Sequence, residues 1–388
     1  TQTSITHLFQ RVDASHVSVD ANRTSLTGTG GKIEIGKAGG GNWRYDGGVI
    51  WRSPELELND VGFLRQADEI KQTASVSRLF LKPTNLYRKA NMQFSQYSTF
   101  DFEGNYNRVQ YEFQGFINYK NNWWTEVGAA HKPRIFSNTV LRGGPRWRWS
   151  EENFAYLFFG SDSRKKMSFT LGYVNSQAAQ NNFSLKRYVL RLSYQPFDAF
   201  NLSVSSEYEE NPNKTQYVTE ENYSGIARYI TGSIDQKTFS TSIRFNYSLN
   251  PNLSIQYYGE PFISRGTYSG FNFVNNPIAK KLEERVTMFS ENQISKATSN
   301  DAYLIDENID GTVDYQIENP DFSYVQFRSN LVLRWEYIPG SEIFLVWSQG
   351  VVGAGNPNET LGKNLNRQIL DQQKDNTFLL KATYRFIL

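Results

Sequence analysis

The segment from Val325 to Tyr337 alternates between apolar and polar side chains with a period of two residues. Its odd-numbered positions are mainly Val, Phe, Leu and Trp, whereas the even-numbered positions include two arginines and a glutamate. Successive side chains of a β-strand point to opposite faces of the sheet. The pattern therefore predicts a long strand with one aromatic-rich apolar face and one charged face.

The same alternation recurs along much of the chain, and helical periodicity is nearly absent. Further examples are RVQYEFQGFINYK (108–120), SLKRYVLRLSY (184–194), FNLSVSSEY (200–208), FSTSIRFNYSL (239–249) and FLLKATYRFIL (378–388). Soluble sandwich strands commonly have five or six residues, whereas tilted transmembrane strands need about 9 to 11. The length of these segments therefore favours strands that cross a membrane.

The predicted fold is an all-β, transmembrane antiparallel β-barrel with short periplasmic turns and long extracellular loops. At ~24 residues per strand and connection, 388 residues give a barrel of roughly 16 strands. We expect one barrel domain over residues 1–388. A weaker candidate strand is TQYVTEE (215–221). A soluble sandwich or propeller is the alternative, and it requires a second layer or short regular repeats that the sequence does not display.

The spacing of the predicted strands gives the connections between them. Short turns are expected at 195–199, 249–252 and 338–341, which places all three on the periplasmic side. Long connections are expected at 272–320 and 351–374, and we interpret 272–320 as a long extracellular loop.

Composition narrows the possible functions. The chain has no cysteine, only three histidines and a formal net charge of +2, and its mean hydropathy is −0.57. No apolar run is long enough for a spanning helix, and no basic cluster favours nucleic acid as a partner. No GxSxG motif accompanies the histidines, so we do not expect an enzyme. The expected location is the outer membrane, with its lipid bilayer as the first partner.

Several longer motifs resemble a known family. They are NWRYDGGVIWRSPELELNDVGFLRQAD, LRGGPRW, GSDSRKK, YSLNPNLSIQYYGEPF with FISRGTYSGF, and NPDFSYVQFRSNLVLRWEYIPGSEIFLVWSQ. Together they resemble the Gram-negative outer-membrane barrel domain that usually follows a family-nine carbohydrate-binding-like module. The resemblance covers nearly the whole chain, and it implies a barrel but no settled biochemical activity.

The resemblance also raises a question about the start of the chain. In the family the barrel usually extends upstream of the segment that corresponds to THLFQRVDASH (6–16), and the β-sandwich module comes before it. Two expectations stay open. Either upstream strands and the sandwich module are missing from this sequence, or a shorter relative closes its barrel with fewer strands.

One acidic segment, DENIDGTVD (306–314), has the spacing of a calcium loop. Asp306, Asn308, Asp310 and Asp314 occupy positions 1, 3, 5 and 9, with Gly311 at position 6. Ile317 stands at position 12, where a bidentate glutamate is usual. The sequence thus predicts either a Ca²⁺ site in an extracellular loop or an acidic turn without a metal.

Charged residues on the polar sides of the strands are expected to line the lumen of the barrel. They are Arg108, Glu112, Arg191, Glu207, Arg244, Arg328, Arg334 and Glu336. LRGGPRWRW (141–149) adds a second candidate, either an anion- or sugar-binding rim or a tight turn that enters a strand.

Two functions follow from these expectations. The first is a porin-like channel or membrane anchor that handles a surface glycan or another polar solute. The alternative is a filled or plugged barrel that acts as a structural subunit of an outer-membrane protein complex. Possible partners are other outer-membrane or surface proteins and polysaccharide.

Overall fold

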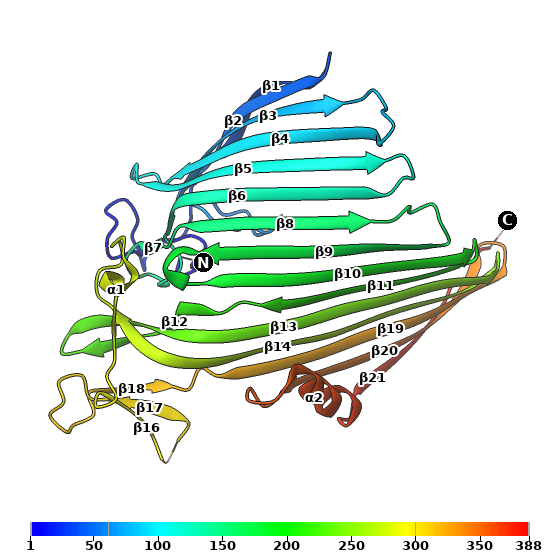
Figure 1. Cartoon of the computed structure of the whole chain (residues 1–388). Helices are drawn as coiled ribbons and strands as arrows, with labels where there is room; N and C mark the ends of the chain where they lie inside the picture. The colour runs from blue at the N-terminus through cyan, green and yellow to red at the C-terminus, as the bar shows by residue number, and fades with distance from the viewer. Residues whose placement is uncertain (1, 61, 299, 387–388) are drawn as a thin grey trace.

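The computed structural model describes residues 2–60, 62–298 and 300–386. These residues form one antiparallel sheet of eighteen strands and a second sheet of three short strands (Figure 1). Helical structure is limited to short turns. The all-β prediction is therefore confirmed.

The strands of the first half of the chain lie mostly in sequence order. They are β1 (Gly30–Lys37), β2 (Trp43–Arg52), β3 (Glu69–Phe80), β4 (Tyr87–Phe100), β5 (Tyr106–Tyr119), β6 (Trp124–Ser137), β7 (Trp147–Trp149), β8 (Glu152–Gly160), β9 (Met167–Ala178) and β10 (Ser184–Phe197). A 3₁₀ turn, η1 (Ala179–Asn181), joins β9 to β10.

The second half contains the longest strands and the short helices. The elements are β11 (Phe200–Glu210), β12 (Asn213–Tyr223), β13 (Ile226–Asn250), β14 (Leu253–Val274), α1 (Leu282–Arg285), β15 (Val286–Met288), β16 (Ile294–Lys296), β17 (Ala302–Ile305), β18 (Tyr315–Glu318), β19 (Phe322–Ile338), β20 (Ser341–Ala354), α2 (Leu361–Leu365), the π-helical turn η2 (Asn366–Leu370) and β21 (Asp375–Ala382).

Three strands of the large sheet lie end to end with another strand, so that both members of each pair share one neighbouring strand. We call each such pair, and each single strand, one line of the sheet. Both β7 and β8 pair with β6, both β12 and β11 pair with β13, and both β15 and β19 pair with β14. The eighteen strands therefore form fifteen lines within the described residues. The candidate strand at 215–221 lies within β12, and because it extends β11 it adds no line of its own.

The alternation in β19 becomes two distinct faces of the sheet. Leu331 pairs with Tyr257 on β14 and Trp347 on β20, whereas Arg334 pairs with Ser254 and Phe344. Side chains of directly paired residues share a face. We call the side that carries Leu331 and Leu333 the apolar face, and the side that carries Arg328 and Arg334 the polar face.

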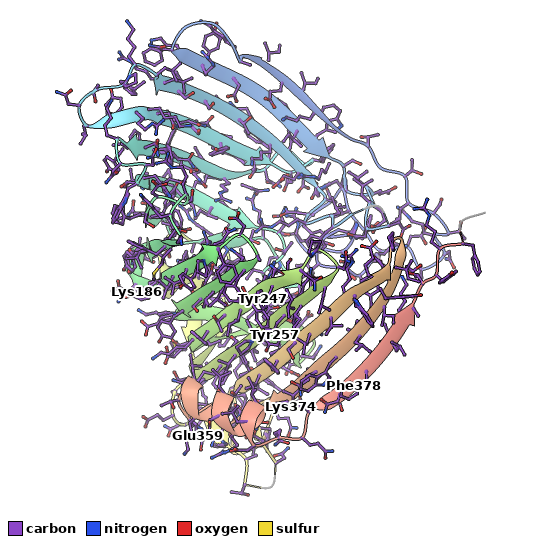
Figure 2. The ribbon with its side chains drawn as sticks, turned by 90° about the vertical axis from the view of Figure 1, so that its right-hand side faces the viewer. Lys186, Tyr247, Tyr257, Glu359, Lys374 and Phe378 are labelled. Carbon is purple, nitrogen blue, oxygen red and sulfur yellow. The ribbon has the colours of Figure 1, made fainter. Side chains whose placement is uncertain are left out.

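The sheet is deeply curved (Figure 2). The polar face is its concave side, because the connection that carries α2 packs on the apolar face and α2 lies on the convex side. Side chains of the polar face from β5, β6, β8, β9, β10 and β12 line a single cavity. The connections at the end near Gly340 are short, and those at the opposite end include 53–68, 275–321 and 355–374. We call these the short-turn end and the long-loop end.

The first and last strands of the curved sheet each have one neighbour. In the parts of the chain that the structure describes, β1 pairs with β2 and β21 pairs with β20, and no pairing joins β1 to β21. A closed barrel of roughly 16 strands therefore stays a prediction. Pairing of the last strand continues to Thr383, which exchanges two backbone hydrogen bonds with Glu342, and the predicted end of the strand at 387–388 lies outside the described residues.

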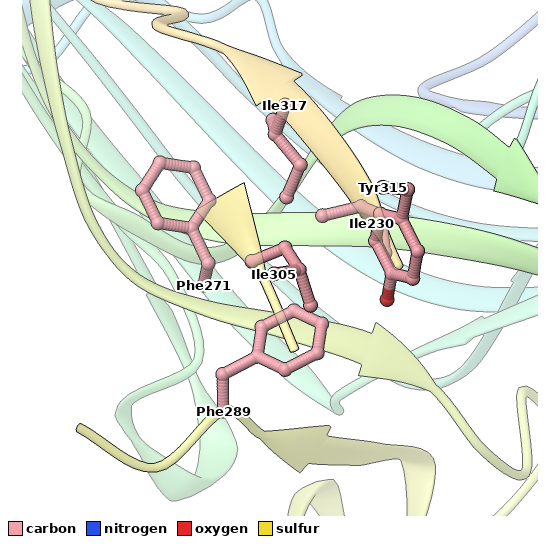
Figure 3. Packing of buried hydrophobic residues seen from close by; sticks show 6 residues of the cluster. All are labelled: Ile230, Phe271, Phe289, Ile305, Tyr315 and Ile317. Carbon is pink, nitrogen blue, oxygen red and sulfur yellow. The ribbon is translucent and has the colours of Figure 1, made fainter. Parts of the chain in front are cut away.

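The connection 275–321 carries the small sheet β16–β17–β18 at the long-loop end. Its hydrophobic core joins it to the extended ends of β13 and β14 (Figure 3). The buried members of this core are Ile230, Phe271, Phe289, Ile305, Tyr315 and Ile317. Arg228 on β13 also forms an ion pair with Glu307 at 2.7 Å. The connection is therefore a folded unit rather than an irregular loop.

The connection 355–374 folds back onto the apolar face. Ile369 of η2 packs against Ile263 on β14 and Val325 on β19, and all three side chains are buried. Figure 1 shows α2 on the convex side of the sheet, next to β19 and β20. None of the helices in the described residues is long and apolar enough to cross a membrane.

Candidate functional site

The apolar face exposes large hydrophobic side chains across the sheet. Burial of apolar area is favourable by about 25 cal/mol per Å², so contiguous exposed apolar patches mark surfaces that contact something other than water. The exposed side chains include Ile33, Ile35, Tyr45, Val49, Val76, Phe94, Phe113, Val127, Leu157, Leu171, Tyr188, Leu190, Ile243, Leu345, Trp347, Phe378 and Leu380. They come from β1 through β21, so the band spans the full width of the sheet.

Aromatic side chains gather where this band approaches the short-turn end. Trp123 packs on Phe159 and Phe169, and Phe197 packs on Phe200 and Tyr247. Trp335 contacts Tyr337, and Arg78 lies over Trp43 and Phe80. Trp and Tyr are enriched where membrane proteins meet the lipid–water interface. These aromatic side chains therefore lie along one edge of the apolar band.

On the polar face, ion pairs join neighbouring strands. Examples are Arg52–Glu69 (3.0 Å), Lys132–Glu152 (2.8 Å), Arg187–Glu209 (2.7 Å) and Arg191–Glu207 (3.8 Å). Among the described residues, every strand-to-strand ion pair on this face links adjacent lines of the sheet. The pairs therefore lie along the wall, and none of them crosses the concave space.

The residues that the sequence predicted for the lumen all lie on the polar face, but not in one cluster. The Nε atom of Arg334 donates to Glu342 at 2.9 Å, and Glu336 lies 3.6 Å away. Arg244 lies over the ring of Tyr258, and Arg328 is opposite Glu260 in the register. Sequence reasoning missed Glu342 and Glu260, although both stand at polar positions of alternating strands.

Two aromatic side chains on the polar face, Tyr156 and Phe158, pack against glycines of neighbouring strands. A Cβ atom on Gly128 would lie 2.1 Å from the ring of Tyr156, and one on Gly172 would lie 2.3 Å from the ring of Phe158. Each ring thus occupies the space that a side chain on the neighbouring strand would fill. This arrangement keeps bulky rings close to the wall.

The N-terminal segment, residues 2–29, contains no strand and packs at the long-loop end. Its Thr6 carbonyl accepts a hydrogen bond from Ala67 in the β2–β3 connection, and Val12 donates to Gly143 in the β6–β7 connection. His16 lies 3.0 Å from Asp68. The segment thus rests on connections that surround the concave space. No local pattern predicted this, because its partners are distant in sequence.

The β2–β3 connection itself reaches into the concave space. Its Arg65 and Gln66 line a cavity of about 530 Å³ together with side chains of β2, β3, β4 and β5 on the polar face. The connection therefore lies between the N-terminal segment and the wall of the sheet.

The LRGGPRWRW segment has buried apolar side chains at Leu141 and Trp147, whereas its arginines are partly or fully exposed. Trp147 is completely buried in a cluster with Leu141 and Tyr229. The guanidinium of Arg146 donates to Asn107 at 3.0 Å, and its backbone N–H donates to Asp13 at 2.8 Å. Arg285 from α1 lies over Trp147, and burial lowers the pKa of Arg285 to about 10. These contacts correspond to the tight-turn interpretation of the segment.

The three histidines have different partners. His7 is buried 2.8 Å from Glu57, and His131 contacts Asn153 at 2.9 Å on the apolar face. Each histidine therefore has a partner close to its own place in the fold.

The candidate calcium loop has its carboxylates turned toward its own backbone. Asp306 accepts hydrogen bonds from the N–H groups of Asp310 and Gly311 at 3.1 and 2.8 Å. Asp314 accepts from the N–H of Glu307 at 2.7 Å. No group of three or more acidic or histidine side chains placed to hold a metal occurs in the described residues. A Ca²⁺ ion held by Asp306, Asn308, Asp310 and Asp314 stays a prediction, which calorimetric titration of the protein against Asp310→Ala would test.

A comparison with protein families covers almost the whole sequence. The profile described as "Domain of unknown function (DUF5916)" matches residues 1–387. The chain belongs to this family. The DUF5916 match includes the curved sheet, the N-terminal segment and both long connections, so these features lie inside a single family unit. A search of curated proteins found no match.

Proposed function

We propose that this chain forms the wall of an outer-membrane β-barrel, with lipid against its apolar face and water along its polar face. The observation that carries the proposal is the band of exposed hydrophobic side chains across the sheet, opposite a face of paired charges. In water such a band would be a large apolar surface, whereas in a bilayer it is the ordinary exterior of a barrel. The gathering of aromatic residues at the short-turn end is consistent with one membrane interface.

The activity that this geometry supports best is conduction of small polar solutes, such as fragments of a surface glycan. The ion pairs on the polar face join neighbouring strands, and the aromatic rings lie against glycines, so neither occupies the concave space. A water-filled interior lined by charged side chains is how porin-like channels pass polar molecules.

The second candidate is a plugged barrel that acts as a structural subunit of an outer-membrane complex. The N-terminal segment favours it, because residues 2–29 pack on the connections at the long-loop end. In the proposed orientation this end is extracellular. The segment would then close the outer mouth of the barrel, either permanently or until a signal releases it.

Single-channel recording in planar bilayers tests the proposal. Stable open steps from the detergent-folded protein are the expected result for a conducting channel. Arg11 of the N-terminal segment lies 3.5 Å from Asp101 in the β4–β5 connection. A protein that inserts but stays silent, and that opens in the Arg11→Ala variant, would identify the N-terminal segment as a plug. Failure of the folded protein to insert into any bilayer would contradict both candidates.

A further inference from the structure

We propose that the cavity under the β2–β3 connection binds an oxyanion, the carboxylate or phosphate group of a polar solute. It lies on the polar face, has a volume of about 530 Å³ and is lined by four basic and two acidic side chains. The lining residues are Ile50, Arg52, Arg65, Gln66, Glu69, Lys71, Tyr97, Thr99, Arg108, Gln110 and Glu112. The inference deepens the proposed function, because it names the class of solute that the interior would hold.

Both acidic side chains of the cavity already have partners. Glu69 accepts a hydrogen bond from Arg52 at 3.0 Å. The two oxygens of Glu112 accept from the amide groups of Gln110 and Gln114 at 2.9 and 2.6 Å. Glu112 keeps its negative charge, because its partners are neutral amides, but four basic and two acidic side chains leave the cavity with a net charge of +2.

Three basic side chains of the cavity have no acidic partner. Among the described residues, no carboxylate lies within 4.0 Å of the charged groups of Arg65, Lys71 or Arg108. Lys71 lies over the ring of Tyr97 at 5.0 Å. Arg108 donates from one terminal nitrogen to Gln110 at 2.6 Å, while its Nε–H is enclosed by protein without an acceptor.

This cluster brings three basic side chains without an ion pair around one cavity. Other basic side chains of the polar face, such as Arg187, Arg334 and Lys132, form close pairs with glutamates of adjacent strands, although Arg244 and Arg328 do not. Like charges repel, and the repulsion is stronger where side chains are partly shielded from water. An oxyanion in the cavity would reduce the repulsion among the three cations.

The donor types also suit such a ligand. Arginine presents a planar fork that matches carboxylate and phosphate oxygens, and lysine supplies a compact point charge. The hydroxyl groups of Tyr97 and Thr99 and the amide of Gln66 line the same cavity. They can hydrogen-bond the uncharged polar part of the solute.

Isothermal titration of the detergent-folded chain tests this inference with citrate and inorganic phosphate as probes. The protein is expected to bind one of them at concentrations up to about 10 mM. Lys71→Gln and Arg108→Gln should each weaken binding about tenfold or more, since each removes a charge-assisted hydrogen bond. Arg191→Gln is the matched control, because it removes an arginine from the same face, where Glu207 pairs with it, and should change affinity less than twofold.

The two probes distinguish a carboxylate from a phosphate ligand. Absence of heat with both probes, or equal weakening by Arg191→Gln and Lys71→Gln, would overturn the inference. If Arg108→Gln does not fold, the comparison of Lys71→Gln with Arg191→Gln still decides the outcome. Titration in detergent does not depend on conduction, so the two proposals can fail separately. Anion binding by a protein that does not conduct would support the site and contradict the channel. Conduction by a protein that does not bind either anion would support the channel and contradict the site.

Discussion

The guanidinium of Arg11 lies 3.5 Å from the carboxylate of Asp101, and both side chains are almost completely buried, at 1% and 0% exposure. Arg11 belongs to the N-terminal segment and Asp101 to the connection between β4 and β5. Asp13 and Glu103 lie near the same guanidinium, at 3.2 and 3.6 Å. The N-terminal segment is thus attached to the long-loop end by a buried charge rather than by surface contacts alone.

Replacement of Arg11 by alanine should release the N-terminal segment. Loss of one partner from a buried ion pair costs about 3 kcal/mol or more, because the remaining carboxylate keeps its desolvation penalty. Limited proteolysis should then cut within residues 2–29 much faster than in the original protein. Arg23→Ala is the control: its pair with Glu55 is more exposed, so its effect should stay below about 1 kcal/mol. Equal cleavage of the two variants would contradict the assigned role of Arg11.

Docking of the segment should also weaken in acid through Glu103. Hydrogen bonds from the hydroxyl and backbone N–H of Ser15 lower the pKa of this carboxyl from 4.5 to about 2. The pKa of Glu103 is lower when the N-terminal segment is docked. The contribution of Glu103 to docking is therefore complete above pH 4.5 and is lost as the pH falls from 4.5 toward 2. A spin label at Ser18→Cys should become mobile over that range.

The Glu103→Gln variant is the matched control for this titration. It keeps a side chain of similar size and lacks the ionisable carboxyl, so the acid transition of the spin label should shrink or shift. An unchanged transition would mean that a group other than Glu103 governs release.

On the polar face, replacement by alanine should be tolerated at Gly350 and should destabilise the protein at Gly128. Gly128→Ala places a Cβ 2.1 Å from the ring of Tyr156, so that ring must move off the wall, at a cost of about 1–3 kcal/mol. Gly350 is also on the polar face, with nothing within 4 Å of its added Cβ. Gly350→Ala should be neutral. Urea unfolding in lipid vesicles measures both, and equal stability of the two variants would contradict the packing described for Tyr156.

The connection 355–374 should depend on Ile369 for its place on the apolar face. Ile369→Ala removes a side chain buried against Ile263 and Val325, and large-to-small changes of this kind cost about 2–5 kcal/mol. The neighbouring Leu370 is 68% exposed, so Leu370→Ala should cost under about 0.5 kcal/mol. Amide hydrogen exchange over residues 355–374 is the measurement. Equal protection in both variants would mean that Ile369 does not anchor the connection.

The sequence predicted the strands well because their pattern is local. The alternation from Val325 to Tyr337 needs only the period of a strand, and it assigned Leu331 and Arg334 to opposite faces correctly. The strand count was less predictable. Strands β11 and β12 pair with one strand, β13, so two apolar runs form a single line of the sheet.

The candidate site was predictable only in part, because only some of its residues belong to strands with a local alternating pattern. Face assignment placed Arg108 on the polar side, but the cavity around it also needs Arg65, which comes from a connection without periodicity. Contacts such as Arg11 with Asp101 join positions about ninety residues apart, and no spacing rule encodes them. The one sequence signal for the N-terminal segment was the lack of alternation before Gly30.

The central claim is that lipid contacts the apolar face and water contacts the polar face. The absence of cysteine allows single cysteines to be placed at Asn330 and Leu331, adjacent residues of β19 on opposite faces. In lipid vesicles, a membrane-impermeant maleimide should label Asn330→Cys and leave Leu331→Cys unlabelled until detergent is added. Equal, rapid labelling of both cysteines in intact vesicles would contradict a membrane-spanning β19.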